Sequence, residues 1–333
     1  MSRLPVSLYI PCYNGEKFIE SCLQGVFSQT CLPGEIIVID DGSIDASVRV
    51  ASQYPVKVIS NRKNSGLGVT RNLGFKSARY ELVAALDADT VPHPDWLVTL
   101  SAHFKSNPRL AGAGGKLIET GIHGIADLWR RVHMSQDWGK HVVLNPRTLF
   151  GNNGLYRKSA VIDVGGFDET LKTNGEDRDL SQKLADRGYE TIYDPSAKVN
   201  HLRTDTIKSV LETRWRWDLP NFTPPDSLPM LIQKLWENYR KMWRFIKQDL
   251  KSDEHATWLL SILMYFVHGG YDVHYLIKRQ PGRVDKHPSI LKALGVTFCI
   301  SLLPFFLLRH SLINLVSIKK RLQSSFRYKT IKN

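Results

Sequence analysis

The sequence predicts an α/β fold, in which a doubly wound and mostly parallel sheet is followed by a helical C-terminal region. Two observations support this prediction. Short apolar runs alternate with helical patterns in the first half of the chain, and long amphipathic helical patterns replace them after His201. The chain has 333 residues, 42% of them hydrophobic and 23% charged, which is enough to bury at least one core and excludes a disordered or fibrous protein.

The first half contains four expected strands and three expected helices. Each strand is a short apolar run, and each helix shows apolar residues at helical spacing. Because strands and helices alternate, the strands are expected to be parallel. In chain order the elements are strand 6–10, helix 16–29, strand 35–40, helix 45–54 with an acidic N-cap, strand 56–60, helix 68–77 and strand 82–86.

The following hundred residues are mixed in pattern. Strands are expected at 114–118, 148–156 and 189–193, and helices at 94–104, 158–164 and 177–187. After His201 the amphipathic helical patterns are broken by prolines within 219–225, which are the candidate linker.

The charge of the chain is concentrated in its C-terminal part. Residues 1–200 hold 23 basic and 22 acidic side chains, whereas residues 201–333 hold 22 and 10. Such an excess suits a polyanion, and Trp mixed with Lys and Arg favours a bilayer surface over nucleic acid. A solvated basic face is the alternative. Five of the eight Trp contribute to this pattern: Trp215, Trp217, Trp236, Trp243 and Trp258.

Several features bear on location. The N-terminus has no apolar segment of signal-peptide length, so we expect a cytoplasmic protein. Residues 294–308 carry no charge but are shorter than the about 20 residues of a full span, so we expect them to lie in or dip into the bilayer, with core packing as the alternative. Seven basic residues and no acid lie within 309–333, as expected beside an anionic cytoplasmic leaflet. The prediction is a peripheral or monotopic protein on the inner face of the membrane.

The four cysteines, Cys12, Cys22, Cys31 and Cys299, show no metal-ligand spacing. We interpret them as reduced packing residues.

Two carboxylates follow the strand at 82–86. Asp87 and Asp89 are separated by one alanine, and acids so placed repel each other unless a cation joins them. Oxygen ligands at a strand end suit Mg²⁺ or Mn²⁺. The alternative is a helix N-cap, since the helix at 94–104 follows. Carboxyl ends of parallel strands are where ligands bind in such sheets, which favours the metal.

The other strand ends suit a nucleotide. Asp41 follows the second strand, where its carboxylate can accept from a base N–H, and Tyr13 follows the first strand, where it can stack on a base. A Gly-rich turn, with Asn64 and Gly66, opens the helix at 68–77, and such turns bind phosphate through free N–H groups. Arg71 lies one turn into that helix, within reach of the ligand.

Six segments in this order resemble one family. Residues 6 to about 205 are similar to the GT-A catalytic domain of family 2 glycosyltransferases, Rossmann-like inverting transferases of nucleotide-activated sugars. Each segment is weak alone, but their order and spacing over about 200 residues are specific. The segments are 6–14 (VSLYIPCYN), 38–43 (VIDDGS), 64–72 (NSGLGVTRN), 87–89 (DAD), 165–169 (GGFDE) and 176–180 (EDRDL).

The resemblance implies roles for individual residues. It assigns Asp177 as the catalytic base, Asp89 and His201 as ligands of a divalent Mn²⁺ or Mg²⁺, and Asp87 to the Asp-x-Asp motif. It also divides the chain into a catalytic domain at 1–205 and a basic, Trp-rich region at 206–333. The nucleotide site then comprises Pro11, Tyr13, Glu16, Asp41, Asn64, Gly66, Arg71 and Asp87.

Further residues are assigned to the sugar or the acceptor. Asn152 and Asn153 lie in a Gly/Asn loop that suits this role, although a structural turn fits equally. Glu176 neighbours Asp177, whose pKa it can raise. Arg214 and Trp215 match part of a Gln-x-x-Arg-Trp motif of processive synthases, but Leu211 replaces the Gln, which argues against processivity.

The predicted function is therefore metal-dependent inverting glycosyl transfer from a nucleotide diphosphate sugar. UDP is favoured because an Asp and an Arg can read uracil, with GDP as the alternative. The expected acceptor is a glycan or lipid-linked saccharide. Two other classes stay open, a sugar-phosphate nucleotidylyltransferase and a catalytically silent membrane- or polyanion-binding protein.

Overall fold

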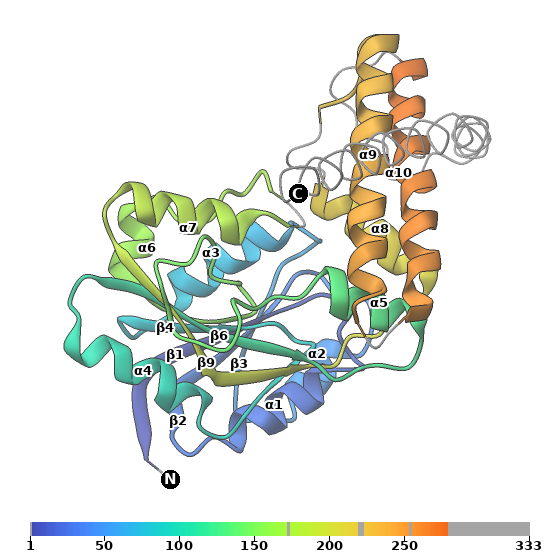
Figure 1. Ribbon diagram of the computed structural model, residues 1–333. Helices are drawn as coiled ribbons and strands as arrows, with labels where there is room; N and C mark the ends of the chain where they lie inside the picture. Colours follow the sequence, from blue (N-terminus) through green and yellow to red (C-terminus); the bar gives the residue numbers. More distant parts are fainter. Residues whose placement is uncertain (1, 172–173, 219–222, 253–254, 279–333) are drawn as a thin grey trace, which may run out of the picture. The chain divides into compact units, whose positions relative to one another are not determined.

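The structure is a computed structural model of the chain, and it describes residues 2–171, 174–218, 223–252 and 255–278 (Figure 1). The chain divides into two compact units, residues 1–220 and 221–333. The boundary predicted at residue 205 concerns function and stays a prediction. The expectations for residues 294–308, for residues 309–333 and for Cys299 lie outside the described residues.

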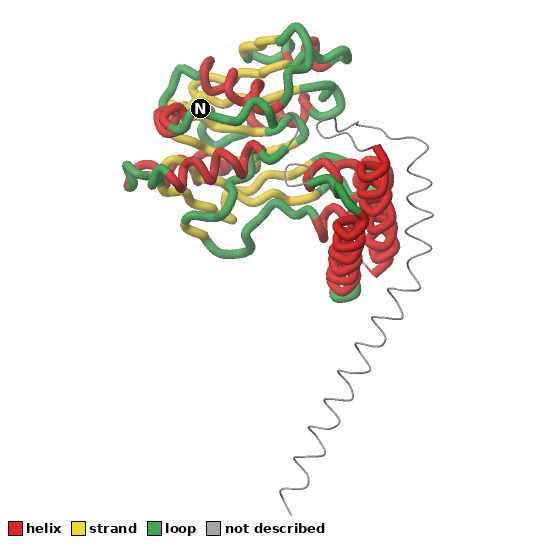
Figure 2. The backbone as a smooth tube through the Cα atoms, turned by 90° about the horizontal axis from the view of Figure 1, so that it is seen from above, coloured by secondary structure: helices red, strands yellow, loops and turns green. Residues whose placement is uncertain are grey.

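The first unit contains a single nine-stranded sheet, whose strands run alongside one another in Figure 2. The strand order is β3-β2-β1-β4-β8-β6-β9-β5, and β7 pairs with β9. One half of the sheet, β3-β2-β1-β4, is parallel. These strands are β1 (Arg3–Cys12), β2 (Leu32–Asp40), β3 (Lys57–Ser60) and β4 (Leu82–Leu86).

The other half of the sheet is mixed. β8 is antiparallel to both β4 and β6, so β6 again points the same way as β4, and β9 is parallel to β6. The carboxyl ends of β4, β6 and β9 therefore reach the same edge of the sheet. The predicted α/β, doubly wound, mostly parallel GT-A fold followed by helices is confirmed. The strands are β5 (Thr90–Pro92), β6 (Leu110–Glu119), β7 (Val143–Leu144), β8 (Asn153–Arg157) and β9 (Glu190–His201).

Helices cover both faces of the sheet because side chains of β1 alternate between them. Leu8 and Ile10 pack into one core with α1, α2 and α4, whereas Tyr9 packs into a second core with α3, α6 and α7. The two groups of helices lie on opposite sides of the sheet in Figure 1. The helices are α1 (Ile19–Phe27), α2 (Ser47–Ala51), α3 (Leu67–Ser77), α4 (Trp96–Ser106), α6 (Lys158–Asp163) and α7 (Glu176–Asp186).

Three local differences separate the structure from the sequence predictions. A strand was expected at 148–156, but the observed strand β8 begins at Asn153. Residues 148–152 form a loop that ends in a turn. Three elements were not expected from the sequence: β5, which directly follows Asp89, the short β7, and α5 (Ile125–His133), which contacts α8 (Ile207–Asp218). Because β5 follows, Asp89 does not cap α4, whose N-cap is Asp95. Cys12 and Cys22 are buried and Cys31 is half-buried, and all three are free thiols.

The second unit, as far as it is described, is a helical hairpin. It contains α9 (Leu228–Asp249), a short 3₁₀ turn η2 (His255–Thr257) and α10 (Trp258–Lys278). Asp249 contacts Ser261 and Asn238 contacts Asp272, so the two helices run antiparallel. Their shared core includes Leu235, Tyr239 and Tyr265. Within the described ranges, we find no helix with both the length and the apolar character that a membrane crossing requires.

Candidate active site

One pocket of about 400 Å³ lies at the edge where β4, β6 and β9 end. Asp87 and Asp89 follow β4, Glu119 ends β6 and His201 ends β9, and all four line it. The remaining walls come from the loop at 148–152, from α3, from the start of α7, from α8, and from α5 with the residues that follow it. Because strands that point the same way end together, residues distant in sequence meet here.

One end of the pocket holds an imidazole between two carboxylates. His201 Nε2 lies 3.4 Å from Asp89 Oδ2, and His201 Nδ1 lies 3.0 Å from both oxygens of Glu119. Burial would lower the pKa of His201, but its hydrogen bonds to Asp89 and Glu119 outweigh burial and raise it to about 9. Burial opposes ionisation of Asp89, yet His201 holds the pKa of that carboxyl below its usual range.

Glu119 is fixed from behind by a buried arginine. Arg130 of α5 lies 3.0 Å from Glu119 Oε2 and 2.5 Å from Asp205 Oδ2. Glu119 also pairs with His201 in the register of β6 and β9, so strand pairing sets their distance. Sequence reasoning missed Glu119. The signal was present, since an acid ends a predicted strand there, but only the fold brings it to His201.

The donor atoms at this end fit a hard divalent cation. Glu119 occupies His201 Nδ1, which leaves Nε2 directed at Asp89, the arrangement seen around metal-binding histidines. Within the described part of the chain no three His, Cys, Asp or Glu side chains form a ready cation cage. Asp89 and His201 are the two residues at this end that could hold Mg²⁺ or Mn²⁺, ions that also take oxygen ligands from a substrate phosphate.

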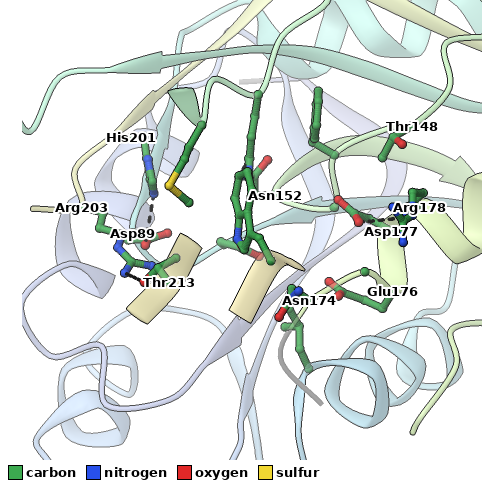
Figure 3. Close-up of a pocket in the computed structure, with 18 of the residues that line it drawn as sticks. Asp89, Thr148, Asn152, Asn174, Glu176, Asp177, Arg178, His201, Arg203 and Thr213 are labelled. Atoms are coloured by element: carbon green, nitrogen blue, oxygen red, sulfur yellow. Dashed lines mark hydrogen bonds and ion pairs between the residues drawn. The ribbon is translucent and has the colours of Figure 1, made fainter. Parts of the chain in front are cut away.

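The other end of the pocket holds Asp177 in the first turn of α7. Gly175 precedes this helix with φ of 93°, a left-handed conformation that favours glycine. The Arg178 backbone N–H donates to Asp177 Oδ1 at 2.7 Å. Burial raises the pKa of Asp177, and the charge of Arg71 opposes that shift. Figure 3 shows Asp89 and His201 on one side of the pocket and Asp177 on the other, with Asn152 between them.

Glu176 has one oxygen committed and one without a partner. Oε1 accepts from Arg71 Nε at 3.3 Å, whereas Oε2 is buried and accepts no hydrogen bond from any residue that the structure describes. Burial raises the pKa of Glu176 to about 7, against the lowering effect of Arg71. An unpartnered buried oxygen beside Asp177 is suited to a ligand hydroxyl.

Arg71 lines the pocket, and its guanidinium is also bonded to protein groups. Its side chain is 2% exposed and donates to Asp87, Glu176 and the Gly151 carbonyl, at 3.0, 3.3 and 2.5 Å. These partners belong to three separate segments that line the pocket. Arg71 therefore joins the walls, with three of its donors already committed to protein groups.

The residues predicted to hold the nucleotide base lie outside the pocket lining. Glu16 Oε2 accepts the Ala46 N–H, which joins the loops after β1 and β2, and Tyr13 is 50% exposed beside them. Pro11 is buried in β1 and Asn64 is exposed. Their ligand roles stay predictions.

The Gly-rich turn before α3 needs a correction. The N–H groups of Ser65 and Gly66 both donate to Asp41, each at 2.9 Å, so neither is free for phosphate as expected. Asn61 also donates to Asp41 at 2.8 Å. The carboxylate closes the turn because these donors would otherwise lack partners.

Two asparagines were predicted to contact the sugar or the acceptor, and one of them lines the pocket. Asn152 lines the pocket, and its buried Oδ1 has no hydrogen-bond partner among the described residues, whereas its Nδ2 donates to Gln136 at 2.5 Å. Asn153 does not line it, because its Oδ1 accepts from Trp96 at 2.6 Å inside the core.

On α8, Arg214 and Trp215 were expected to contact the sugar or the acceptor, but other residues of this helix line the pocket. Trp215 is buried and Arg214 lies 2.8 Å from Asp218, and neither lines the pocket. Thr213 and Trp217 line it instead. They are four residues apart and so share a helix face, from which the intervening positions are rotated away.

Comparison with known proteins identifies the first part of the chain. Residues 7–164 match the family model described as Glycosyl transferase family 2. Poly-beta-1,6-N-acetyl-D-glucosamine synthase of Staphylococcus aureus strain COL is 31% identical over 227 residues, covering 64% of this chain and 53% of that protein. The synthase of the same name from Staphylococcus epidermidis is 31% identical over 277 residues, covering 78% and 64%.

Solved structures include S. aureus TarS 1–349 in complex with UDP. It matches with a TM-score of 0.49 at 19% identity, over 84% of this chain and 82% of that one. The present chain spans 53% to 64% of the length of the two synthases.

Proposed function

We propose that the chain, whose residues 7–164 match the Glycosyl transferase family 2 model, transfers a sugar from a nucleotide diphosphate sugar to a hydroxyl of a glycan or lipid-linked saccharide. UDP is the favoured nucleotide. The matched synthases are named for poly-β-1,6-N-acetyl-D-glucosamine, so we extend the proposal to an N-acetylhexosamine donor and a polysaccharide acceptor. Nucleic acid is not a proposed partner.

One observation carries this proposal. Asp89 and His201 lie at one end of the same pocket that holds Asp177 at its other end. Transfer with inversion needs an electrophilic clamp on the leaving diphosphate and a base on the opposite side of the anomeric carbon. A single pocket with both groups at opposite ends meets this requirement.

Asp177 is the proposed base. Its carboxylate accepts the proton of the acceptor hydroxyl while that oxygen bonds to the anomeric carbon and the bond from that carbon to the diphosphate breaks. Burial raises the pKa of Asp177, which makes it a better proton acceptor, and Arg71 keeps that shift from becoming too large. A divalent cation, when bound by Asp89 and His201, neutralises charge on the leaving diphosphate.

The two unpartnered oxygens between these ends are proposed to bind the sugar. Asn152 Oδ1 and Glu176 Oε2 are buried acceptors that line the pocket. Hydroxyl and acetamido N–H groups would satisfy both. The nucleotide is proposed to extend from Asp87 toward Asp41 and Tyr13, where the strand-end loops gather.

Replacement of the base tests the mechanism. We expect Asp177→Asn to lower the transfer rate by about 10²- to 10⁴-fold, because the amide cannot take the proton. Binding of UDP, measured by calorimetry with Mn²⁺, should persist. Release of UDP rather than pyrophosphate distinguishes transfer from nucleotidylyl transfer.

The matched control is Asp179→Asn on the same helix. Asp179 lies 2.7 Å from Lys183 and does not line the pocket, so this variant should retain its rate. Undiminished turnover of Asp177→Asn would remove Asp177 from the mechanism.

The proposed location is the cytoplasmic face of a membrane, with the protein peripheral or monotopic. The basic C-terminal part supports this proposal, with 22 basic against 10 acidic residues in 201–333. The proposed division of labour places catalysis in residues 1–205, with Thr213 and Trp217 of α8 also lining the pocket, and membrane association in the rest of 206–333.

A further inference from the structure

The tryptophans that suggested a membrane surface are mostly engaged elsewhere. Trp215 is buried in the first unit, Trp217 lines the pocket, and Trp236 and Trp243 pack against the core of the hairpin. Of the five, only Trp258 is among the exposed large hydrophobic residues. The contact surface therefore has to be located from exposed side chains rather than from Trp content.

The outer face of α9 carries four exposed basic residues in a line. Successive members are 4, 3 and 4 positions apart, so they lie on one face of the helix and of the turn that follows it. Exposed Glu237 precedes them by one turn, and the one acid between 238 and 252, Asp249, is fully buried. We name this set the basic stripe: Arg240, Arg244, Lys247 and Lys251.

The stripe ends at a group of exposed apolar side chains. The two helices are pinned together here, because Asp249 accepts from Thr257 Oγ1 at 2.7 Å and from Ser261 Oγ at 2.6 Å. The residues around this junction point outward. We name them the apolar tip: Leu250, Trp258, Leu259 and Leu263, which are 57%, 38%, 53% and 39% exposed.

We propose that the basic stripe and the apolar tip together dock on an anionic lipid bilayer. Transfer of exposed leucine side chains from water to the edge of the acyl chains is favourable in free energy, and a Trp is favoured at the level of the headgroups. Lys and Arg beside them are attracted to anionic lipid and can extend their stems along the apolar surface. A solvated basic helix would not explain four large apolar side chains at its end.

Binding to vesicles tests this proposal without relying on glycosyl transfer. The full chain is mixed with phosphatidylcholine vesicles, with or without about 30% phosphatidylglycerol, and the bound fraction is measured by flotation. We expect binding to the anionic vesicles that weakens in high salt. Asp177→Asn should bind equally well, so failure of the proposed catalysis leaves this test unaffected.

Two variants separate the basic and apolar contributions. R240Q/R244Q/K247Q/K251Q should bind anionic vesicles at least about tenfold more weakly, since each basic residue adds to the attraction. L250S/L259S/L263S should also bind about tenfold more weakly, with the largest relative loss in high salt, where apolar insertion dominates. Circular dichroism checks that α9 and α10 stay helical.

The matched control removes the same net charge elsewhere. R49Q/K57Q/K76Q/K105Q alters four exposed basic residues of the first unit, none of which lines the pocket, and should bind like the unmodified chain. Equal loss in both fourfold variants would overturn the proposal, because binding would then follow net charge alone. It is also overturned if the stripe variant loses binding to a single-stranded oligonucleotide while its vesicle binding is unchanged.

Discussion

At the scale of single residues, the candidate site depends on two buried arginines that do not carry out its chemistry. Arg71 forms ion pairs with Asp87 and Glu176. Arg130 forms an ion pair with Glu119, which in turn contacts His201. A buried carboxylate without such a partner would be costly, since the unpaired charge keeps no water shell. The acids can therefore be concentrated in one pocket only because cations are buried with them.

Arg71 allows a sharp test through pH. Arg71→Gln should lose activity by about a hundredfold or more, and the acid limb of its rate profile should move to higher pH, because the positive charge that lowers the pKa of Asp177 is gone. Glu176, Arg178 and Tyr156 also face Asp177 and stay in place.

The variant Arg71→Lys supplies the control. Lysine keeps the positive charge but cannot make the three hydrogen bonds of the guanidinium group. The rate should therefore fall, while the acid limb of the pH–rate profile stays near that of the unmodified chain. A profile of Arg71→Gln that does not move would show that Arg71 only supports the fold.

Glu119 is expected to act through His201. In Glu119→Gln the imidazole loses a charged hydrogen-bond partner, and Mn²⁺ affinity measured by electron paramagnetic resonance should fall about 10- to 100-fold. Glu190→Gln, at the opposite end of β9, should leave affinity unchanged. Equal Mn²⁺ binding by the unmodified chain and Glu119→Gln would exclude this role.

The site could be predicted only where its residues form contiguous motifs. Asp87 and Asp89 were proposed because two acids at a strand end carry a local signal, whereas Asp177 was proposed only because segment 176–180 resembles a family motif. Glu119 and Arg130 were missed because their importance arises from strand pairing and a helix contact. Asp41 and Gly66 were chosen from their positions, but their hydrogen bonds to each other follow from a tertiary closure that no spacing encodes.

At the scale of elements, short apolar runs that alternate with helical patterns predicted the parallel half of the sheet. β1 to β4 and the helices between them follow the expected order because each is a local pattern packed on both sides. The reversal at β8 was not predictable, since an apolar run carries no sign of its direction. The turn at 148–152 was read as strand because its apolar residues, Leu149 among them, serve the core from a turn.

The hairpin of α9 and α10 contains a buried acid that ties its stability to pH. Burial raises the pKa of Asp272 to about 7, despite the lowering effect of Lys234 and a hydrogen bond from Asn238. The folded state then holds a proton that the unfolded state has released, so the free energy of unfolding falls as pH rises from about 4 to about 7, and stays low above that.

Asp272→Asn should remove this pH-dependent decrease in the free energy of unfolding, because an amide does not ionise. Hydrogen exchange of α9 and α10 amides should be slower in the variant than in the unmodified chain at pH 8, with little difference near pH 5. The exposed acid Asp226 supplies the control, because Asp226→Asn should change neither value. A variant that gains nothing at pH 8 would contradict the burial of a charged Asp272.

At the scale of the whole molecule, the chain divides into two compact units, and our proposals place ligand binding in the first and membrane contact in the second. A ligand that binds only the native first unit should stabilise that unit by about 2.7 kcal/mol at a hundredfold excess over its Kd. We expect UDP with Mn²⁺ to slow hydrogen exchange in residues 1–220 and to leave α9 and α10 unchanged. Asp89→Asn should weaken the effect of Mn²⁺, and protection that spreads equally over both units would contradict their independence.

The two ends of the pocket rest on different kinds of support. Glu119 and His201 are paired across neighbouring strands, whereas Asn152 lies in a turn and Asp177 follows Gly175 at the first turn of a helix. In the proposed reaction, each cycle releases a nucleotide diphosphate and binds a new donor. A paired strand end cannot swing aside without breaking several ladder bonds at once, while a turn can. We therefore expect the side of the pocket with Glu119 and His201 to move little. The nucleotide and the donor are expected to enter and leave past Asn152 and Gly175.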